Sequence, residues 1–293
     1  MKAVPFDYVA ANSADEALGA LTDAGDDGMV LAGGQTLVPM LAMRLARPAI
    51  LVDINRVAEW SGIAMDGGAV SFKTCTRQSA ALTSSDLAQN LPLLAKALPL
   101  VGHQQTRNRG TVGGSIAHGD PAAEIPLVAT ALEAEITLSS SDGNRVVKSG
   151  DFYEGPMMSV REPGECVTDV SFPIWEGGQV GADFQEVAER HGDFAIVSAA
   201  AQLQWNGDGT CVRAALAVGG AGGTPVRLSD AEGVLAGSAV TEESIADALS
   251  GLDGALDPAD DLHGSADYRR RVARVLMTRA IENAAAEARG SAT

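Results

Sequence analysis

Two glycine-rich segments constrain this chain most strongly. The first is Leu31-Ala32-Gly33-Gly34-Gln35-Thr36-Leu37-Val38, and the second runs from Arg107 to Pro121 and contains Gly110-Thr111-Val112-Gly113-Gly114-Ser115. Glycine permits positive φ and close approach of the backbone to a ligand, so that several N–H groups can converge on an anion such as a diphosphate. Both segments also carry hydroxyl or amide side chains. Two such loops in one chain predict a ligand that is held from two sides.

Length and charge exclude several classes of protein. With 293 residues, of which 46% are hydrophobic, the chain can bury substantial cores and is expected to form two or more domains. The formal charge of −17 repels phosphate backbones and anionic lipid, so we expect no nucleic-acid or membrane partner. The N-terminus lacks an apolar leader and no long apolar run follows, which predicts a cytoplasmic location.

The cysteines limit the metal chemistry of the chain. Cys75, Cys166 and Cys211 lie far apart and form no local pattern for an iron–sulfur cluster or a structural zinc. An odd number of unpatterned cysteines fits reduced thiols in a cytosol. We therefore expect no metal in this chain, and any metal chemistry should belong to a partner.

The first part of the chain alternates helical and strand patterns. A helix is expected from Ser13 to Gly25, because Ser13 and Glu16 have capping-box spacing and glycine can end the helix. Further strands are expected at 29–32, 49–54, 69–72, 134–139 and 167–172, further helices at 36–44, 79–88, 91–100 and 124–132, and a turn at 141–144.

The second part follows a glycine-containing linker at 175–178. Asn206-Gly207-Asp208-Gly209 is a strong hairpin signal between two apolar runs. Strands are expected at 184–188, 195–205 and 212–218, helices at 229–235, 241–249 and 265–288, and the glycine cluster 219–223 should end a hairpin. The whole chain is therefore predicted to be α+β, with an antiparallel meander in its second half.

Five segments in the same order resemble a known family. They are AGGQTLVP (32–39), RNRGTVGGSIAHGDPAAEIP (107–126), EPGECVTDVSFP (162–173), AERHGDFAIVSAAA (188–201) and HGSADYRRRVARVL (263–276). Together they resemble the FAD-binding medium subunit of the molybdenum hydroxylases, a family that includes the flavoproteins of xanthine dehydrogenase and aerobic carbon monoxide dehydrogenase. The resemblance extends from about Pro5 to about Ala284.

The resemblance implies a two-lobed FAD-binding domain of the vanillyl-alcohol-oxidase/PCMH type at 1–174, with lobes at about 1–55 and 56–174. An α+β domain like the C-terminal domain of the CO dehydrogenase flavoprotein would follow at 179–289.

The resemblance also implies the residues that contact FAD. Both glycine segments would bind its diphosphate, Glu124 would hold ribityl or ribose hydroxyls, and Phe194 beside Asp193 would lie against the isoalloxazine. The full predicted set is Leu31, Ala32, Gly33, Gly34, Gln35, Thr36, Leu37, Val101, Thr111, Gly113, Gly114, Ser115, Glu124, Val167, Asp193 and Phe194. The residues alone leave simpler roles open: ordinary turns, a solvated acid at a helix start for Glu124, and core packing for Val101, Val167 and Phe194.

The implied function is electron transfer within a larger complex. FAD would be bound by this chain, [2Fe–2S] clusters by a small subunit and the molybdenum cofactor by a large molybdopterin subunit, in a heterotrimer or a dimer of heterotrimers. Ser115 and Gly119 replace common Asn and Ala residues, and Gln185-Glu186 replaces a lysine, which leaves the tuning of the flavin open. The alternatives are a self-contained FAD-dependent oxidase or reductase, or a non-catalytic nucleotide-binding scaffold.

Overall fold

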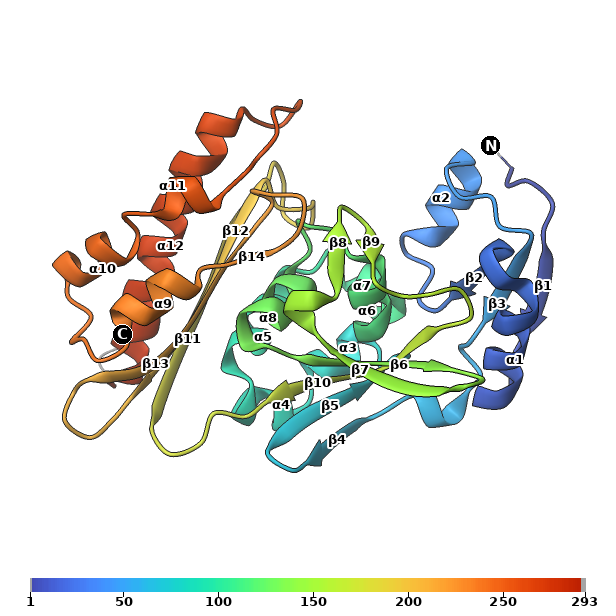
Figure 1. Cartoon of the computed structure of the whole chain (residues 1–293), viewed down its shortest axis with the longest axis horizontal. Helices are drawn as coiled ribbons and strands as arrows, with labels where there is room; N and C mark the ends of the chain where they lie inside the picture. The colour runs from blue at the N-terminus through green and yellow to red at the C-terminus, as the bar shows by residue number, and fades with distance from the viewer. Residues whose placement is uncertain (1, 291–293) are drawn as a thin grey trace.

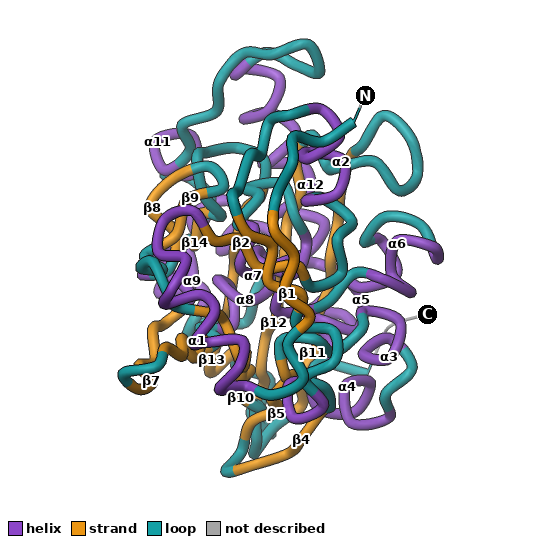
Figure 2. The backbone as a smooth tube through the Cα atoms, turned by 90° about the vertical axis from the view of Figure 1, so that its right-hand side faces the viewer, coloured by secondary structure: helices purple, strands orange, loops and turns teal. Residues whose placement is uncertain are grey.

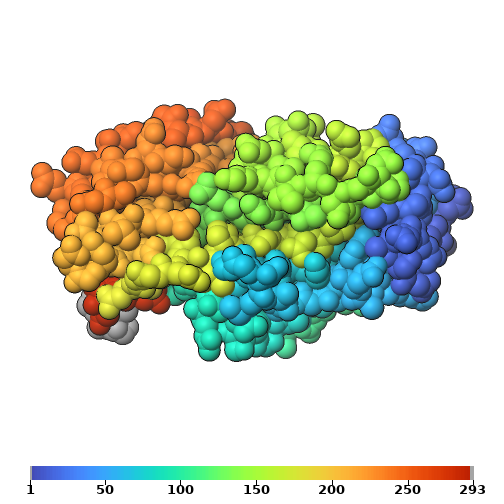
Figure 3. All heavy atoms as spheres, turned by 60° about the horizontal axis from the view of Figure 1, so that its bottom comes forward, coloured from blue at the N-terminus to red at the C-terminus, as the bar shows by residue number. Residues whose placement is uncertain are grey.

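The computed structural model describes residues 2–290, which form three main sheets in a row and a small two-stranded sheet. Figure 1 shows the N-terminal sheet at one end, a helix-covered central sheet, and a C-terminal sheet backed by a long helix at the other end. The space-filling view in Figure 3 shows the same order along the long axis. The predicted α+β fold is confirmed.

The first sheet is parallel and has the order β1-β3-β2. It lies nearest the viewer in Figure 2. Its strands and helices are β1 (Asp7–Ala10), α1 (Ala14–Ala24), β2 (Gly28–Leu31), α2 (Leu37–Met43) and β3 (Ile50–Asp53), with a 3-10 turn at Gly25–Asp27. As predicted, the Ser13 side chain accepts a hydrogen bond from the Glu16 N–H and caps α1, and Gly25 ends the helix at φ 54°. The first glycine segment therefore connects β2 to α2.

The central sheet is antiparallel and has the order β4-β5-β10-β6-β7. Its strands are β4 (Ile63–Asp66), β5 (Ala69–Lys73), β6 (Glu135–Ser140), β7 (Gly143–Lys148) and β10 (Cys166–Pro173). The accompanying helices are α3 (Gln78–Leu82), α4 (Ser85–Asn90), α5 (Pro92–Ala97), α6 (Gln104–Arg109), α7 (Val112–His118) and α8 (Glu124–Leu132), with 3-10 turns at Ala58–Trp60, Leu98–Leu100 and Ser149–Asp151. A short ribbon pairs β8 (Tyr153–Gly155) with β9 (Met158–Ser159).

Two predictions for this part need correction. The single helix expected at 79–88 is two helices, because the chain breaks at Thr83 and Ser84 then caps α4 by accepting a hydrogen bond from the Leu87 N–H. The second glycine segment, expected to be a loop, contains the end of α6 and all of α7. Thr111 starts α7 by accepting a hydrogen bond from the Gly114 N–H, and Gly119 ends it at φ 65°.

The third sheet is an antiparallel meander, as predicted, and is followed by helices. Its strands are β11 (Gln179–Val187), β12 (Val197–Trp205), β13 (Cys211–Gly219) and β14 (Val226–Arg227), and the helices are α9 (Ser229–Leu235), α10 (Glu242–Ala248), α11 (Leu252–Ala255) and α12 (Ala266–Ala288). The predicted hairpin joins β12 to β13, where the Asn206 N–H donates to the Thr210 carbonyl.

Small side chains cover both faces of the third sheet. Ala182, Ala200 and Ala217 belong to the core shared with the helices of the central part, whereas Ala199 and Ala201 belong to the core shared with α12. This alternation follows from the two-residue period of a strand. The sheet is thus a thin layer between two groups of helices.

Within residues 2–290, none of the helices combines the length and the apolar character that crossing a bilayer requires.

Candidate functional site

A cleft of about 530 Å³ lies between the first sheet, the central helices and the loop that joins β11 to β12. It is lined by all the predicted site residues except Leu31, namely Ala32, Gly33, Gly34, Gln35, Thr36, Leu37, Val101, Thr111, Gly113, Gly114, Ser115, Glu124, Val167, Asp193 and Phe194. Residues that are up to about 160 positions apart in sequence therefore share one cavity. Their individual roles in binding stay a prediction.

The first glycine segment presents free N–H groups to this cleft. Gly34 has φ 70°, which turns the chain between β2 and α2. Within residues 2–290, the backbone N–H groups of Gly33, Gly34, Gln35 and Thr36 donate no hydrogen bond. Consecutive unpaired N–H groups at a turn are suited to an anion.

The second segment contributes in another way. The Gly113 N–H donates to the Thr74 carbonyl at 3.2 Å, and the Gly114 N–H donates to Thr111 Oγ1 at 3.0 Å. These two N–H groups are therefore occupied, contrary to the expectation that both segments offer free backbone amides. The Thr111 hydroxyl proton and the Ser115 hydroxyl remain able to donate to a ligand.

The glycines also allow the two segments to touch. A methyl group at Gly33 would lie 2.5 Å from the Arg109 carbonyl oxygen and 2.8 Å from Gly110 Cα. A methyl group at Gly113 would lie 2.2 Å from Thr74 Oγ1. Contacts this short are impossible for real carbon atoms, so a larger residue at Gly33 would push the two segments apart, and one at Gly113 would push α7 away from Thr74.

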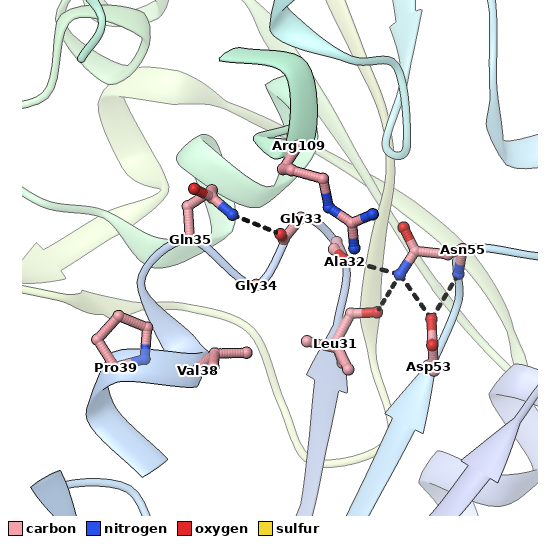
Figure 4. A pocket seen from close by; sticks show the side chains of 10 residues that line it. All are labelled: Leu31, Ala32, Gly33, Gly34, Gln35, Val38, Pro39, Asp53, Asn55 and Arg109. Atoms are coloured by element: carbon pink, nitrogen blue, oxygen red, sulfur yellow. Dashed lines mark hydrogen bonds between the residues drawn. The ribbon is translucent and has the colours of Figure 1, made fainter. Parts of the chain in front are cut away.

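A side-chain bridge that sequence analysis missed joins the two segments. Asn55 Nδ2 donates to the Ala32 carbonyl at 2.8 Å, and Asn55 Oδ1 accepts from Arg77, which also donates to the Arg109 carbonyl. Figure 4 shows the Asn55 amide directed at the carbonyl groups of the first segment, with Arg109 reaching over the segment from α6. No sequence motif marks Asn55 or Arg77, because their relationship is purely tertiary.

A smaller pocket of about 260 Å³ adjoins the cleft and shares Ala32, Gly33, Gly34 and Gln35 with it. Leu31, the one predicted residue outside the cleft, lines this pocket together with Asp53. Tyr8, Asn55 and Arg56 hold the pKa of Asp53 below its usual value, against the opposing effect of burial. The first segment is therefore accessible from two cavities.

Glu124 is the first residue of α8, and its side chain lines the cleft although the residue is only 4% exposed. Burial raises its pKa to about 8, and the nearby charges of Glu186 and Asp120 also raise it, whereas its own backbone N–H and Arg107 act in the opposite direction. In its protonated form Glu124 can donate a hydrogen bond as well as accept one, whereas the ionised form only accepts.

Gln78 is a second polar group that sequence analysis missed. It lies in α3, lines the cleft, and its Oε1 atom is buried without a hydrogen-bond partner among residues 2–290. An unpaired buried carbonyl costs free energy unless a ligand supplies a donor. This oxygen packs against the second glycine segment, where a methyl group at Gly110 would lie 2.5 Å from it.

The loop between β11 and β12 reaches the cleft from the C-terminal part of the chain. Gly192 has φ 88° and lies so close to His103 that a methyl group there would be 2.5 Å from the imidazole. The rings of His103 and His191 are 6.0 Å apart between centroids. Phe194 follows in this loop and is 58% exposed, so it is not a core residue.

These residues fit FAD chemically. Free N–H groups and hydroxyls suit a diphosphate, the carboxyl group of Glu124 suits hydroxyl groups, and apolar side chains such as Val101 and Val167 suit ring systems.

The chain matches two sequence families along most of its length. Residues 4–175 match the FAD binding domain in molybdopterin dehydrogenase, and residues 182–284 match the CO dehydrogenase flavoprotein C-terminal domain.

Two curated relatives and a solved structure are similar over nearly whole chains. The alpha subunit of the 6-hydroxypseudooxynicotine dehydrogenase complex of Paenarthrobacter nicotinovorans is 41% identical, covering 99% of this chain and 97% of the relative. The carbon monoxide dehydrogenase medium chain of Afipia carboxidovorans is 34% identical, covering 97% and 98%. A solved Cu,Mo-CO dehydrogenase in its cyanide-inactivated form superimposes with a TM-score of 0.95 at 34% identity, covering 98% of this chain and 100% of the other.

Proposed function

The chain belongs to the FAD-binding medium subunits of the molybdenum hydroxylases, and from this membership we propose that it carries electrons through a bound FAD from a partner subunit to an external acceptor. The observation that carries the proposal is the cleft in which both glycine segments meet beneath a loop of the C-terminal part. Its unpaired N–H groups support the proposal, because they suit the diphosphate of such a cofactor.

Each part of the cleft has a distinct task in this proposal. The N–H groups of Gly33 to Thr36 bind the diphosphate, and the hydroxyls of Thr111 and Ser115 add donors from the other side. Glu124 holds cofactor hydroxyls, and Phe194 covers the ring system. FAD, when bound, exchanges electrons singly or in pairs, so it can connect one-electron clusters with a two-electron acceptor.

We further propose that the partners are a small [2Fe–2S] subunit and a large molybdopterin subunit, in a heterotrimer or a dimer of heterotrimers. The relatives named above, a complex subunit and a medium chain, support a multi-subunit assembly. The substrate would be chosen by the molybdenum subunit. The cytoplasm remains the proposed location, and we keep 1–174 and 179–289 as the proposed domain limits.

A direct test uses the purified full chain, stripped of ligand and then mixed with FAD. We expect a yellow, stoichiometric complex that does not oxidise or reduce small organic substrates or NADH until both partner subunits are added. Turnover by the chain alone would favour the alternative of a self-contained oxidase or reductase. Failure to bind FAD would refute the proposal.

A further inference from the structure

Among residues 2–290, three buried side-chain oxygens on the third sheet lack partners, those of Glu186, Ser198 and Gln202, and the first two are neighbours. Glu186 in β11 and Ser198 in β12 lie directly opposite each other, and residues opposite each other in an antiparallel pair project from the same face. Within residues 2–290, neither Glu186 Oε2 nor Ser198 Oγ has a hydrogen-bond partner, although both atoms are buried. By strand alternation this face also carries Ala182 and Phe184, which pack against the helices of the central part.

This face meets the chain just before α8. Ser198 is paired with Gly219 of β13, and a methyl group at Gly219 would lie 2.6 Å from Ser198 Oγ, 3.2 Å from Leu127 Cδ2 and 3.3 Å from the Pro121 carbonyl oxygen. The Gly220 N–H donates to that same carbonyl at 2.9 Å. We call the contact of β11–β13 with α8 and the residues before it the interdomain seam. Glu186 therefore lies on the side of the sheet that faces Glu124.

The carboxyl groups of Glu124 and Glu186 form no ion pair with any Lys, Arg or His side chain among the described residues. Burial raises the pKa of Glu186 to about 7, and burial together with the charge of Glu186 raises the pKa of Glu124 to about 8. Asp120 adds negative charge beside Glu124. The positive charge of Arg107 opposes this effect, and its guanidinium donates hydrogen bonds to the carbonyls of Pro99, Val101 and Gly102.

We propose that Glu124 and Glu186, two buried carboxyl groups without ion pairs, act together as a carboxyl pair across the interdomain seam and take up a proton when an anionic cofactor enters the cleft. The inference rests on the proposed function, because it needs FAD as the anion. A diphosphate brings negative charge to the cleft that Glu124 lines, and negative charge favours the protonated form of a carboxyl group. Glu186 is then a positioning residue for the charge state of the site, acting through Glu124.

Reciprocity between binding and protonation gives a measurable consequence. If FAD binding favours proton uptake, protons must favour FAD binding by the same factor. FAD should therefore bind more weakly as the pH rises from about 6.5 to about 8.5. The dissociation constant can rise by at most about tenfold per pH unit for each proton that is taken up.

The test counts protons. Calorimetric titration of the flavin-free full chain with FAD, in two buffers of different ionisation enthalpy, gives the protons taken up per FAD between pH 6 and 9. The wild-type chain should take up about half a proton or more near pH 7.5. Glu186→Gln and Glu124→Gln should each take up less than half of the wild-type amount, and the double variant none.

Glu189→Gln is the matched control, because it removes an equal charge from an exposed position three residues further on. It should leave proton uptake at the wild-type value. FAD binding by the wild-type chain without proton uptake would overturn the carboxyl pair, as would wild-type uptake by Glu186→Gln. Both results would leave the proposed function intact, whereas a chain that binds no FAD at any pH would refute that function. If a variant does not fold, FAD binding by the wild-type chain without proton uptake still overturns the carboxyl pair.

Discussion

Replacing Gly33 by alanine should weaken FAD binding without greatly weakening the fold. The added methyl group would lie 2.5 Å from the Arg109 carbonyl oxygen, about 1 Å closer than a favourable carbon–oxygen contact. Both atoms nearest to the methyl group are backbone atoms, so no side chain can rotate away. The two glycine segments must therefore separate. Gly33 does not have positive φ, so the effect is steric.

The size of the effect follows from the cost of overpacking, about 1–3 kcal/mol. In the free protein the segments can move apart and relieve most of this cost, and alanine also stabilises by restricting the unfolded chain by about 0.4–1 kcal/mol. FAD binding requires the original distance between the two glycine segments. The overpacking cost of about 1–3 kcal/mol is therefore lost from the binding free energy, which raises the dissociation constant for FAD about 5- to 150-fold.

Quenching of flavin fluorescence gives the dissociation constant, and urea denaturation gives the free energy of unfolding. Gly19→Ala is the matched control, because Gly19 lies within α1 and a methyl group there would meet no atom within 4 Å. It should leave FAD binding unchanged and stabilise the helix by about 0.5–1 kcal/mol. Wild-type affinity in Gly33→Ala would show that the close contact between the segments does not shape the binding site.

Three further predictions concern the surroundings of the cleft. Arg77→Met removes the bridge to the Arg109 carbonyl and should lower the free energy of unfolding, measured in urea, by about 1.5–3 kcal/mol. Arg77→Lys should restore little of this loss, because lysine lacks the planar guanidinium that bonds Asn55 and the Arg109 carbonyl together. Full recovery of stability in Arg77→Lys would contradict this reasoning. Because burial raises the pKa of Glu124 to about 8, the folded chain keeps a proton that the unfolded chain loses above about pH 4.5, so stability should fall from about pH 5 to pH 8. Glu124→Gln should flatten this slope in thermal unfolding, and an unchanged slope would assign it to other groups. Burial raises the pKa of the Cys75 and Cys166 thiols, to about 11 and about 12, so Ellman's reagent at pH 8 should label them only after denaturation, and fast labelling of the native chain would show that the thiols are accessible.

The sequence predicted those elements whose signals are local. Ser13 and Gly25 delimit α1, the run 124–132 coincides with α8, and 206–209 joins β12 to β13. Capping residues, apolar periodicity and turn glycines act over a few positions, so they can be recognised without the fold. The family resemblance then supplied the residues that line the cleft, which lie too far apart for any pattern to connect them.

Other features depend on contacts that no local pattern encodes. β1 is only four residues long and gains its partner, β3, from some 40 positions away. The glycines of the second segment looked like loop residues, yet α7 forms there because Thr111 caps it and Thr74 packs against Gly113. The Asn55–Arg77 bridge and the raised pKa of Glu124 arise from tertiary contacts and burial.

The alanine-covered third sheet has a consequence for how the two halves of the molecule are spaced. Ala182, Ala200 and Ala217 lie on the side of the sheet that faces the central helices. Alanine has the smallest side chain of any chiral residue, so the sheet and the helices approach closely there. Each added methylene there would increase the distance between the sheet and the central helices. It would also move the loop that carries Phe194 relative to the glycine segments. The distance between the two halves is thus adjustable in steps of single carbon atoms, at positions that do not line the cleft.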